Sequence, residues 1–307
     1  MTIGSSNPGA ARACRTLAWL AGASLCVLTP FLARAATEPV QIVEAAPDAT
    51  AAPMPPAADS YTAEQRSFLA ALDRLLAAQN YSALAEQILS PKISAHLKPS
   101  LDWTRTGTLT GRSIIVPLIY ASLLWELGVN YPQFADFKTS SGIVALYALL
   151  VAHADSFKCA DPTAPSHRIE LIGEQYRNQF TALAAEPEVK RRDAITAAIN
   201  MERTIAELRG NDKYLCRFGM QETLDDLQKH QGEPVTARPK SAFAGFEIEL
   251  PRDPDYEPSF LPRDEWAKKQ AAARAGFPAM LAGFLAKYKT RAAQPQTSAL
   301  PEAAPSR

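Results

Sequence analysis

Two segments of this sequence are apolar on every side of a helix. The first is IIVPLIYASLLWEL, residues 114–127, and the second is the apolar part of GIVALYALLVAHADSF, residues 143–154. Both are shorter than the roughly 20 apolar residues that a membrane-spanning helix needs. A short helix without a polar face is normally surrounded by other helices. The sequence therefore predicts an all-α protein, a single multi-helix bundle with two buried apolar helices.

Amphipathic segments that can cover this core lie before it. Residues 62–79 begin with Thr62 and Gln65, which form a capping box, and continue with leucines at helical spacing. A short helix is expected over residues 82–89. Ser141 is expected to cap the second apolar helix, because serine readily accepts a hydrogen bond from the first turn.

Two amphipathic helices are expected after the core, over residues 167–185 and 188–209. Ser166 is the expected N-cap of the first helix, and Pro187 suits the first turn of the second. Helices of similar length that are joined by a tight turn form an antiparallel hairpin. The open end of this hairpin joins the stretches before residue 167 and after residue 209.

The N-terminal residues have the pattern of a secretory signal peptide. Arg12 and Arg15 form a basic start, residues 17–32 are apolar, and ARA, which ends at Ala35, has small residues where a signal peptidase cleaves. We expect a signal peptide over residues 1–35, with a retained anchor helix as the alternative. The mature protein is expected to be periplasmic or secreted, with no transmembrane span.

Cleavage after Ala35 would leave two of the four cysteines, Cys159 and Cys216. An even pair of cysteines in an exported chain predicts a disulfide bond. A zinc site would require further ligands at a recognisable spacing. Because both cysteines lie at the open end of the predicted hairpin, we expect a disulfide-stapled antiparallel helical hairpin.

The charge balance excludes one class of partner. Removal of the signal peptide takes away three arginines and no acids, so 32 basic residues become 29 against 32 acidic ones, a net charge of −3. A protein that binds nucleic acid needs a basic patch to neutralise phosphates. No nucleic-acid partner is therefore expected.

Stretches rich in alanine and proline flank the predicted domain. Residues 36–59 and 291–307 have no periodic apolar face and cannot offset the entropy cost of ordering. We predict a disordered linker, a disordered C-terminal tail and, between them, one helical domain over residues 60–290. Within it, residues 233–262 contain six prolines and one strand-like alternation, at residues 246–250, so an extended segment is expected before the last helix.

Two helical segments lie on either side of this extended segment. Residues 220–231 are amphipathic and end at Gly232. The last helix is expected over residues 264–288. Gly276 and Pro278 should kink it or split it, because proline removes a backbone donor and its ring clashes with the preceding turn.

The polar stretch DWTRTGTLTGRS, residues 102–113, is expected to be a loop and is the best candidate for a ligand site. Its candidate ligand-binding side chains are Arg105, Thr108, Thr110, Arg112 and Ser113. They lie just before an apolar helix, and the N-terminus of a helix attracts anions. A P-loop is not matched, since the glycine spacing is one residue short and no strand precedes it. One alternative is a site for a phosphate, carboxylate or glycan. The other is a glycine-rich cap that binds nothing and only lets the apolar helix pack into the bundle.

No catalytic motif is present. His167 lies near Glu170 and Glu174, as a general base would, but no nucleophile or oxyanion donor accompanies it. An exposed histidine in the first turn of a helix is therefore the better interpretation. The sequence contains neither H-E-x-x-H, nor S-x-x-K, nor G-x-S-x-G. No catalytic residue, metal ligand or cofactor is predicted.

These features favour an exported helical protein that works by binding or scaffolding in the cell envelope. Its partner would be an envelope protein or a small anionic ligand. The alternative is an envelope hydrolase or transferase with an anion-binding loop at residues 104–113 and His167 in its cleft.

Overall fold

The bundle is organised around two apolar helices, α5 (Ile115–Asn130) and α6 (Phe137–Asp155), which pack against each other. The computed structural model describes residues 60–90, 94–232, 236–239, 246–249, 253 and 256–292. The predicted signal peptide, the linker and the C-terminal tail beyond Ala292 lie outside these residues. All described residues belong to one unit, Ala46–Arg307.

The remaining elements follow the same chain order as the predicted segments. They are α2 (Ala63–Ala77), α3 (Tyr81–Leu89), η2 (Ser94–His96), α4 (Leu97–Leu109), η3 (Pro132–Phe134), η4 (Ser156–Lys158), α7 (Thr163–Gln175), α8 (Arg177–Ala185), α9 (Glu188–Ile205), η5 (Ala206–Leu208), α10 (Lys213–Cys216), α11 (Met220–Lys229), β1 (Thr236–Pro239), β2 (Phe246–Glu249) and α12 (Arg263–Ala292). The all-α, multi-helix prediction is confirmed.

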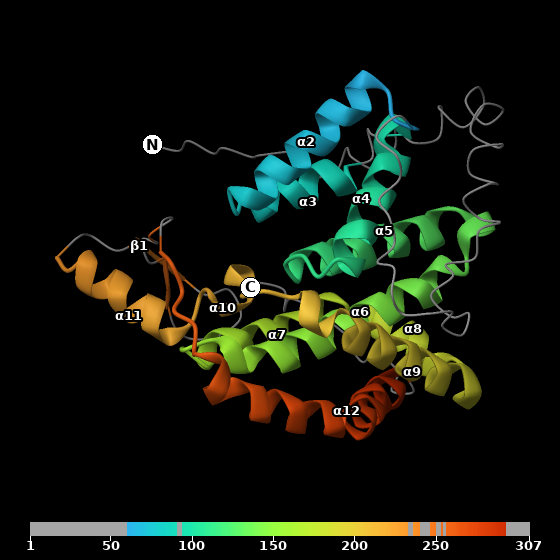
Figure 1. Ribbon diagram of the computed structural model, residues 1–307. Coiled ribbons are helices and arrows are strands. Elements are labelled where there is room, and N and C mark those ends of the chain that lie inside the picture. Colours follow the sequence, from blue (N-terminus) through green and yellow to red (C-terminus); the bar gives the residue numbers. More distant parts are fainter. Residues whose placement is uncertain are drawn as a thin grey trace, which may run out of the picture. The chain divides into compact units, whose positions relative to one another are not determined.

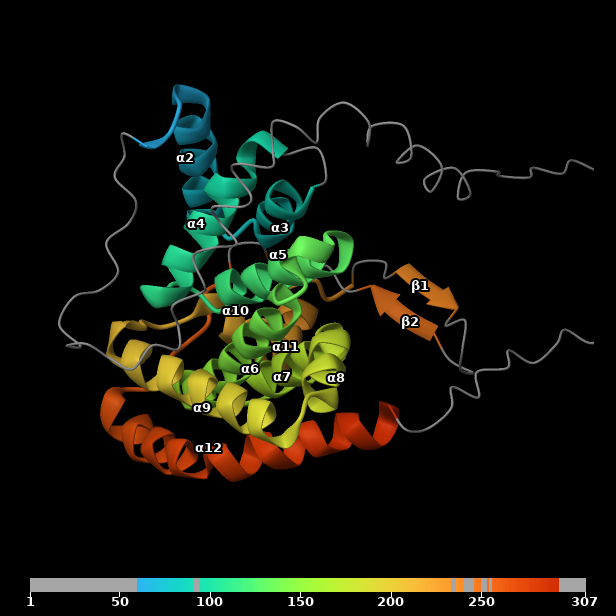
Figure 2. The same cartoon turned by 90° about the vertical axis from the view of Figure 1, so that its right-hand side faces the viewer.

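The helices form layers on either side of α5 and α6 (Figures 1 and 2). On one side, α3 and α4 pack on α5, and α2 packs on α3 and α4. On the other side, α7, α8 and α9 pack on α6, and α12 packs across α8, α9 and α6. The predicted capping box is present: the Gln65 backbone N–H donates to Thr62 Oγ1 at 3.2 Å, and the Thr62 N–H donates to Gln65 Oε1 at 3.0 Å.

Helix α6 is buried along most of its length. Leu146, Leu149 and Leu150 have no exposed surface. Together with the turn after it, Phe137–Lys158, this helix is long and apolar enough to cross a membrane, and 72% of its most apolar stretch is buried among the other helices. Such burial is that of a central core helix.

The predicted loop over residues 102–113 is wrong for most of its length. Helix α4 continues to Leu109, and only the short turn from Thr110 to Ile114 separates it from α5. Gly107 permits a close helix crossing, because a Cβ atom there would lie 2.8 Å from Val116 Cγ1. Gly111 does have the left-handed backbone (φ 71°) that favours glycine. The glycines therefore serve packing and a tight turn, not a long loop.

Both predicted serine caps are also wrong. Helix α6 begins four residues before Ser141, whose buried hydroxyl donates to the Ala121 carbonyl at 2.6 Å and so ties α6 to α5. Helix α7 begins at Thr163, before Ser166, whose hydroxyl donates back to the Pro162 carbonyl at 2.9 Å. Each serine hydroxyl thus donates a hydrogen bond to a carbonyl, and neither serine is the residue that caps the start of its helix.

The helix predicted over residues 167–185 is divided into α7 and α8 at Tyr176. The Tyr176 hydroxyl donates to the Leu118 carbonyl at 2.7 Å and lies 3.1 Å from Ser122 Oγ. The carbonyl of Gly173 accepts a hydrogen bond from Tyr288 at 2.7 Å. The Tyr176 N–H still donates to the Ile172 carbonyl, and the Phe180 N–H to the Tyr176 carbonyl, both at 3.0 Å. The division at Tyr176 thus accompanies side-chain contacts with α5 and α12 that the sequence pattern alone did not show.

Of the segment before the last helix, the described residues 236–239 and 246–249 are extended, as expected, and form two paired strands. The strand-like alternation lies in β2, which pairs antiparallel with β1, with Ala237 opposite Ile248. Helix α12 is continuous through Pro278 and is not split, although Figures 1 and 2 show that its two halves point in different directions. Of the two expected outcomes, a kinked helix or a split one, the structure has the kinked helix.

Candidate functional site

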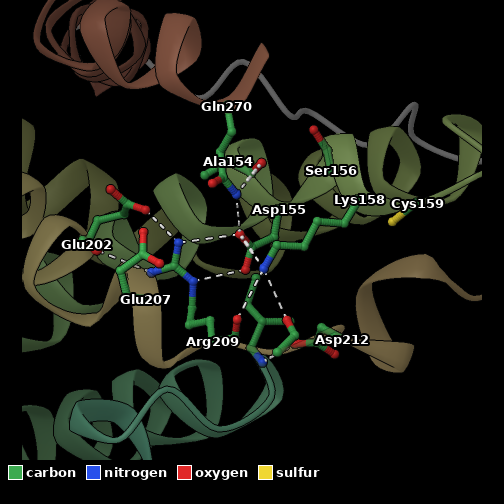
Figure 3. Close-up of polar contacts among 12 residues, drawn as sticks. Ala154, Asp155, Ser156, Lys158, Cys159, Glu202, Glu207, Arg209, Asp212 and Gln270 are labelled. Carbon is green, nitrogen blue, oxygen red and sulfur yellow. Dashed lines mark hydrogen bonds and ion pairs between the residues drawn. The ribbon is translucent and has the colours of Figure 1, made fainter. Parts of the chain in front are cut away.

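The end of α6 and the segment after η5 meet in a cluster of buried charged side chains (Figure 3). We call Asp155, Lys158, Glu202, Arg209 and Asp212 the polar junction. Each of these five residues is at most 9% exposed. Buried charges are costly unless they are paired, so their partners decide whether this cluster can react with a ligand.

Arg209 is the centre of the polar junction. Its Nε lies 2.9 Å from Asp155 Oδ2, and its Nη2 lies 2.5 Å from Glu202 Oε1. The two carboxylates raise the pKa of Arg209, against the lowering effect of burial. Arg274 adds a second cation to Glu202 at 3.0 Å, and Lys158 adds one to Asp155 at 3.3 Å. Each of the two carboxylates is therefore held by two cations.

The predicted disulfide between Cys159 and Cys216 is confirmed, with its Cα atoms 5.3 Å apart. Both cysteines are buried. The bond joins the turn after α6 to α10 and closes a segment that contains α7, α8 and α9, both arms of which pack on α6. The chain before α12 joins the same turn, because Leu261 N donates to the Lys158 carbonyl at 2.8 Å and Ala160 N donates to the Ser259 carbonyl at 3.0 Å.

The predicted ligand-binding residues are not brought together. Arg105 is exposed on α4. The hydroxyls of Thr108 and Thr110 donate to carbonyls one turn earlier in the same helix, at 2.8 Å each. Only Arg112 and Ser113 line a pocket of about 420 Å³, which lies between α2, the α4–α5 turn and the polar junction.

The polar groups of Arg112 and Ser113 are already bonded within the chain. Arg112 Nη1 lies 2.7 Å from Asp73 Oδ1, and its guanidinium carbon lies 5.2 Å from the centre of the Trp103 ring. Ser113 donates to Asp212 Oδ1 at 3.0 Å. These two side chains are therefore engaged within the chain, whereas Gln79 Oε1, on another part of the pocket wall, is buried without a hydrogen-bond partner.

An acidic side chain does lie at the start of α5, where helix physics favours one, but it belongs to the protein. Asp212 Oδ2 accepts a hydrogen bond from the Ile114 backbone N–H at 2.5 Å. Its Oδ1 also accepts from the Leu215 N–H at 3.4 Å, at the start of α10. One carboxylate thus caps two helices, and it occupies the position that the sequence suggested for a phosphate or a carboxylate ligand.

Replacement of Asp212 with alanine should lower the free energy of unfolding by about 1–3 kcal/mol, because the Ile114 N–H and the Ser113 hydroxyl lose their acceptor. Asp212→Asn keeps an acceptor and should cost less. Burial raises the pKa of Asp212 above its ordinary value of 3.8, against the opposing hydrogen bonds from Ile114 and Ser113. The folded state therefore holds the Asp212 proton more tightly than the unfolded state. The stability that this gives is complete below pH 3.8 and is lost as the pH rises through the raised pKa of the folded state.

Urea denaturation of the wild type and both variants at several pH values measures this effect. Relative to Asp212→Asn, the wild type should lose stability as the pH rises from about 4. Equal costs for the alanine and asparagine variants, unchanged with pH, would show that the carboxylate neither caps α5 nor has a raised pKa.

Helix α11 has an unusual orientation. It buries two acidic residues, Glu222 and Asp226, and exposes Met220, Leu224 and Leu227 by 58%, 46% and 44%. An amphipathic helix on a protein surface normally does the reverse. The amphipathic pattern was visible in the sequence, but the sequence did not show which face would be buried.

Specific pairs hold the acids of α11 inside. Glu222 Oε1 accepts from Arg217 Nη2 at 2.7 Å and from Arg217 Nε at 3.2 Å. Asp226 Oδ1 accepts from the Asp253 backbone N–H at 3.2 Å. These bonds fix the rotation of α11, so its three large apolar side chains face outward.

Phe218, directly before α11, has a left-handed backbone with φ of 68°. This conformation is rare for a bulky residue, and such strain persists only where the surrounding structure imposes it, often at binding sites. The ring is 37% exposed, with the guanidinium carbons of Arg217 and Arg168 at 5.2 and 5.6 Å from its centre. Phe218 and the exposed residues of α11 form what we call the apolar surface: Phe218, Met220, Leu224 and Leu227.

His167, the one histidine considered for catalysis, is exposed on α7 and lines neither the pocket beside Arg112 nor a second one beside Arg168. Within the described ranges, no group of three or more histidine, cysteine or acidic side chains is arranged to hold a metal ion. No family model, curated protein or solved structure matches this chain.

Proposed function

We propose that this protein is exported to the cell envelope and functions there by binding another protein chain through the apolar surface. The observation that carries the proposal is the orientation of α11, which exposes Met220, Leu224 and Leu227 while acids are buried. Exposed apolar residues that cluster on one helix are typical of interaction sites, and aromatic, methionine and arginine side chains are enriched at such sites.

Export is supported by the N-terminal pattern and by the cysteines. Residues 1–35 combine a basic start, an apolar run and a small-residue cleavage motif. The buried Cys159–Cys216 bond fits an oxidising compartment, since disulfides rarely persist in a reducing cytosol. A scaffolding or binding role in the periplasm is consistent with both.

The alternative, an envelope hydrolase or transferase, has less support. Its expected loop is mostly helix α4, and the start of α5 is capped by Asp212. The charged groups of Asp155, Arg209 and Arg112 are paired within the chain. Binding through the apolar surface therefore accounts for more of the geometry.

In-cell photo-crosslinking tests the proposed function. A photo-reactive amino acid at position 224 of the full chain should give a discrete adduct in the envelope fraction, because Leu224 lies at the centre of the exposed face of α11. The matched control is position 189, since Val189 is similarly exposed, at 58%, but lies on α9. Adducts of equal yield at both positions, or none at position 224, would contradict the proposal.

A further inference from the structure

We infer that the apolar surface binds a second copy of this chain, so that two α11 helices pack antiparallel across a twofold axis. This inference rests on the proposed function and identifies the partner within it. It follows from the spacing of the exposed residues, from the positions of the charges on α11, and from the residues that flank the exposed face.

The spacing of the exposed residues is symmetric. Met220 precedes Leu224 by four residues, and Leu227 follows it by three, so Leu224 lies at the middle of the row. This alternation of four and three is that of a helix–helix seam. When two such helices run antiparallel about Leu224, each Leu224 faces its own copy, and Met220 is offset by one residue, about 1.5 Å along the axis, from Leu227 of the other chain. A twofold interface requires this kind of self-complementary surface.

The charges of α11 permit this pairing although the helix is acidic. Glu222 and Asp226 are buried, and Glu222 is paired with Arg217 inside the bundle. Asp225 is turned about 100° away from Leu224 around the helix axis and accepts a hydrogen bond from Gln221 at 2.8 Å. No carboxylate of α11 therefore lies in the row of exposed apolar residues, where a second copy would place a like charge opposite it.

The residues that flank the row are uncharged and polar. Gln221 and Gln228 lie on one side, and Thr223 lies on the other. In an antiparallel pair, Gln221 of one chain is placed beside Gln228 of the other, and two amide side chains can both donate and accept. The flanks are thus complementary to themselves and select neither a basic nor an acidic partner.

The size of the seam sets the expected strength. Helix α11 has ten residues, so two copies bury less than the roughly 1,200–2,000 Å² of a stable interface, and a weak dimer is expected, with a Kd on the order of 10–100 µM. Phe218 extends the contact beyond the start of the helix.

Sedimentation velocity of the exported, disulfide-bonded chain should show a monomer–dimer equilibrium over a concentration range that spans this value. Leu224→Asp places two carboxylates on the axis and should shift the Kd at least 10-fold toward monomer. Val189→Asp, an equally drastic change at an exposed residue of α9, should leave the equilibrium unchanged. A wild type that remains monomeric throughout, or an equal effect of both variants, would overturn the inference.

Cysteine crosslinking tests the direction of the helices and does not depend on the folding of the aspartate variant. Under mild oxidation, Leu224→Cys should form a covalent homodimer. Met220→Cys and Leu227→Cys should crosslink when mixed and much less when each is alone. In a parallel pairing, Met220→Cys and Leu227→Cys would each crosslink alone and much less when mixed. Either that result or the absence of any crosslink would overturn the inference.

Binding of another protein and pairing with a second copy can be tested separately. If the chain is monomeric and no cysteine pair crosslinks, but position 224 still gives an adduct with a different protein in cells, the second-copy inference fails and the proposed function stands. If neither the photo-adduct at position 224 nor any cysteine crosslink forms, both the proposed function and the second-copy inference fail.

Discussion

Replacement of Glu202 with glutamine should lower the free energy of unfolding by about 3–5 kcal/mol, the range found when one partner of a buried ion pair is removed. The Glu202 carboxylate is 1% exposed and faces two guanidinium groups, those of Arg209 and Arg274. Without its charge, Arg274 loses the carboxylate with which it pairs. Arg209 and Lys158 are then left to share the single carboxylate of Asp155 (Figure 3). Glutamine has nearly the same shape as glutamate, so the loss of unfolding free energy measures charge compensation and not the creation of a cavity.

The matched control is Glu207→Gln, five residues further along the chain. The Glu207 side chain is 81% exposed and pairs with Arg263 at 3.4 Å. Exposed pairs contribute about 0–1 kcal/mol, so this variant should unfold close to the wild-type midpoint. Urea titrations with a common m value measure both changes. Equal small effects of the two variants would show that the polar junction does not depend on its charges.

Simultaneous replacement of Cys159 and Cys216 with serine should lower the free energy of unfolding by about 4 kcal/mol. The bond closes a loop of 57 residues and restricts the unfolded chain, and loops of this length are stabilised by roughly that amount in a chain-entropy description. The effect should be visible as a lower denaturant midpoint in the exported, oxidised protein.

Reduction of the wild type provides the control for the cysteine variant. A reductant should bring the wild-type midpoint close to that of the double serine variant and should leave the variant unchanged. Thiol labelling of the denatured, unreduced mature protein should find no reactive cysteine. Two labelled thiols, or a midpoint indifferent to the reductant, would show that the bond is absent or does not stabilise the fold.

The parts of the fold that were predictable from the sequence depend on local signals. The apolar character of residues 114–127 and 143–154 identified α5 and α6, and the pair Thr62 and Gln65 identified the start of α2. The disulfide followed from cysteine parity and from the turn between two helices. In each case the decisive residues lie close together in the sequence or have no alternative partner.

The parts that were missed depend on partners far away in the chain. Gly107 was interpreted as a loop residue because Val116, the side chain that needs the space, lies on the next helix. Tyr176, where one expected helix divides into two, contacts Leu118 and Ser122 of α5. The polar junction joins residues 155, 158, 202, 209 and 212, none of which is marked by a local motif.

The candidate site illustrates the same limit. The sequence suggested an external anion at the start of α5 and could not show that Asp212, 98 residues away from Ile114, lies there. Two signals were available in retrospect. Asp212 lies four residues before Cys216, and the acids of α11 lie at the i, i+4 spacing that places both on one face.

The position of Asp212 also determines how strongly it competes with soluble ligands. The Cys159–Cys216 bond and the hydrogen bond of Lys158 with the Gly210 carbonyl hold this stretch of chain against the end of α6. A group held in this way acts at an effective concentration of millimolar or above, on the scale of short tethers. A dissolved carboxylate of equal intrinsic affinity must therefore exceed that concentration to displace Asp212 from the Ile114 amide.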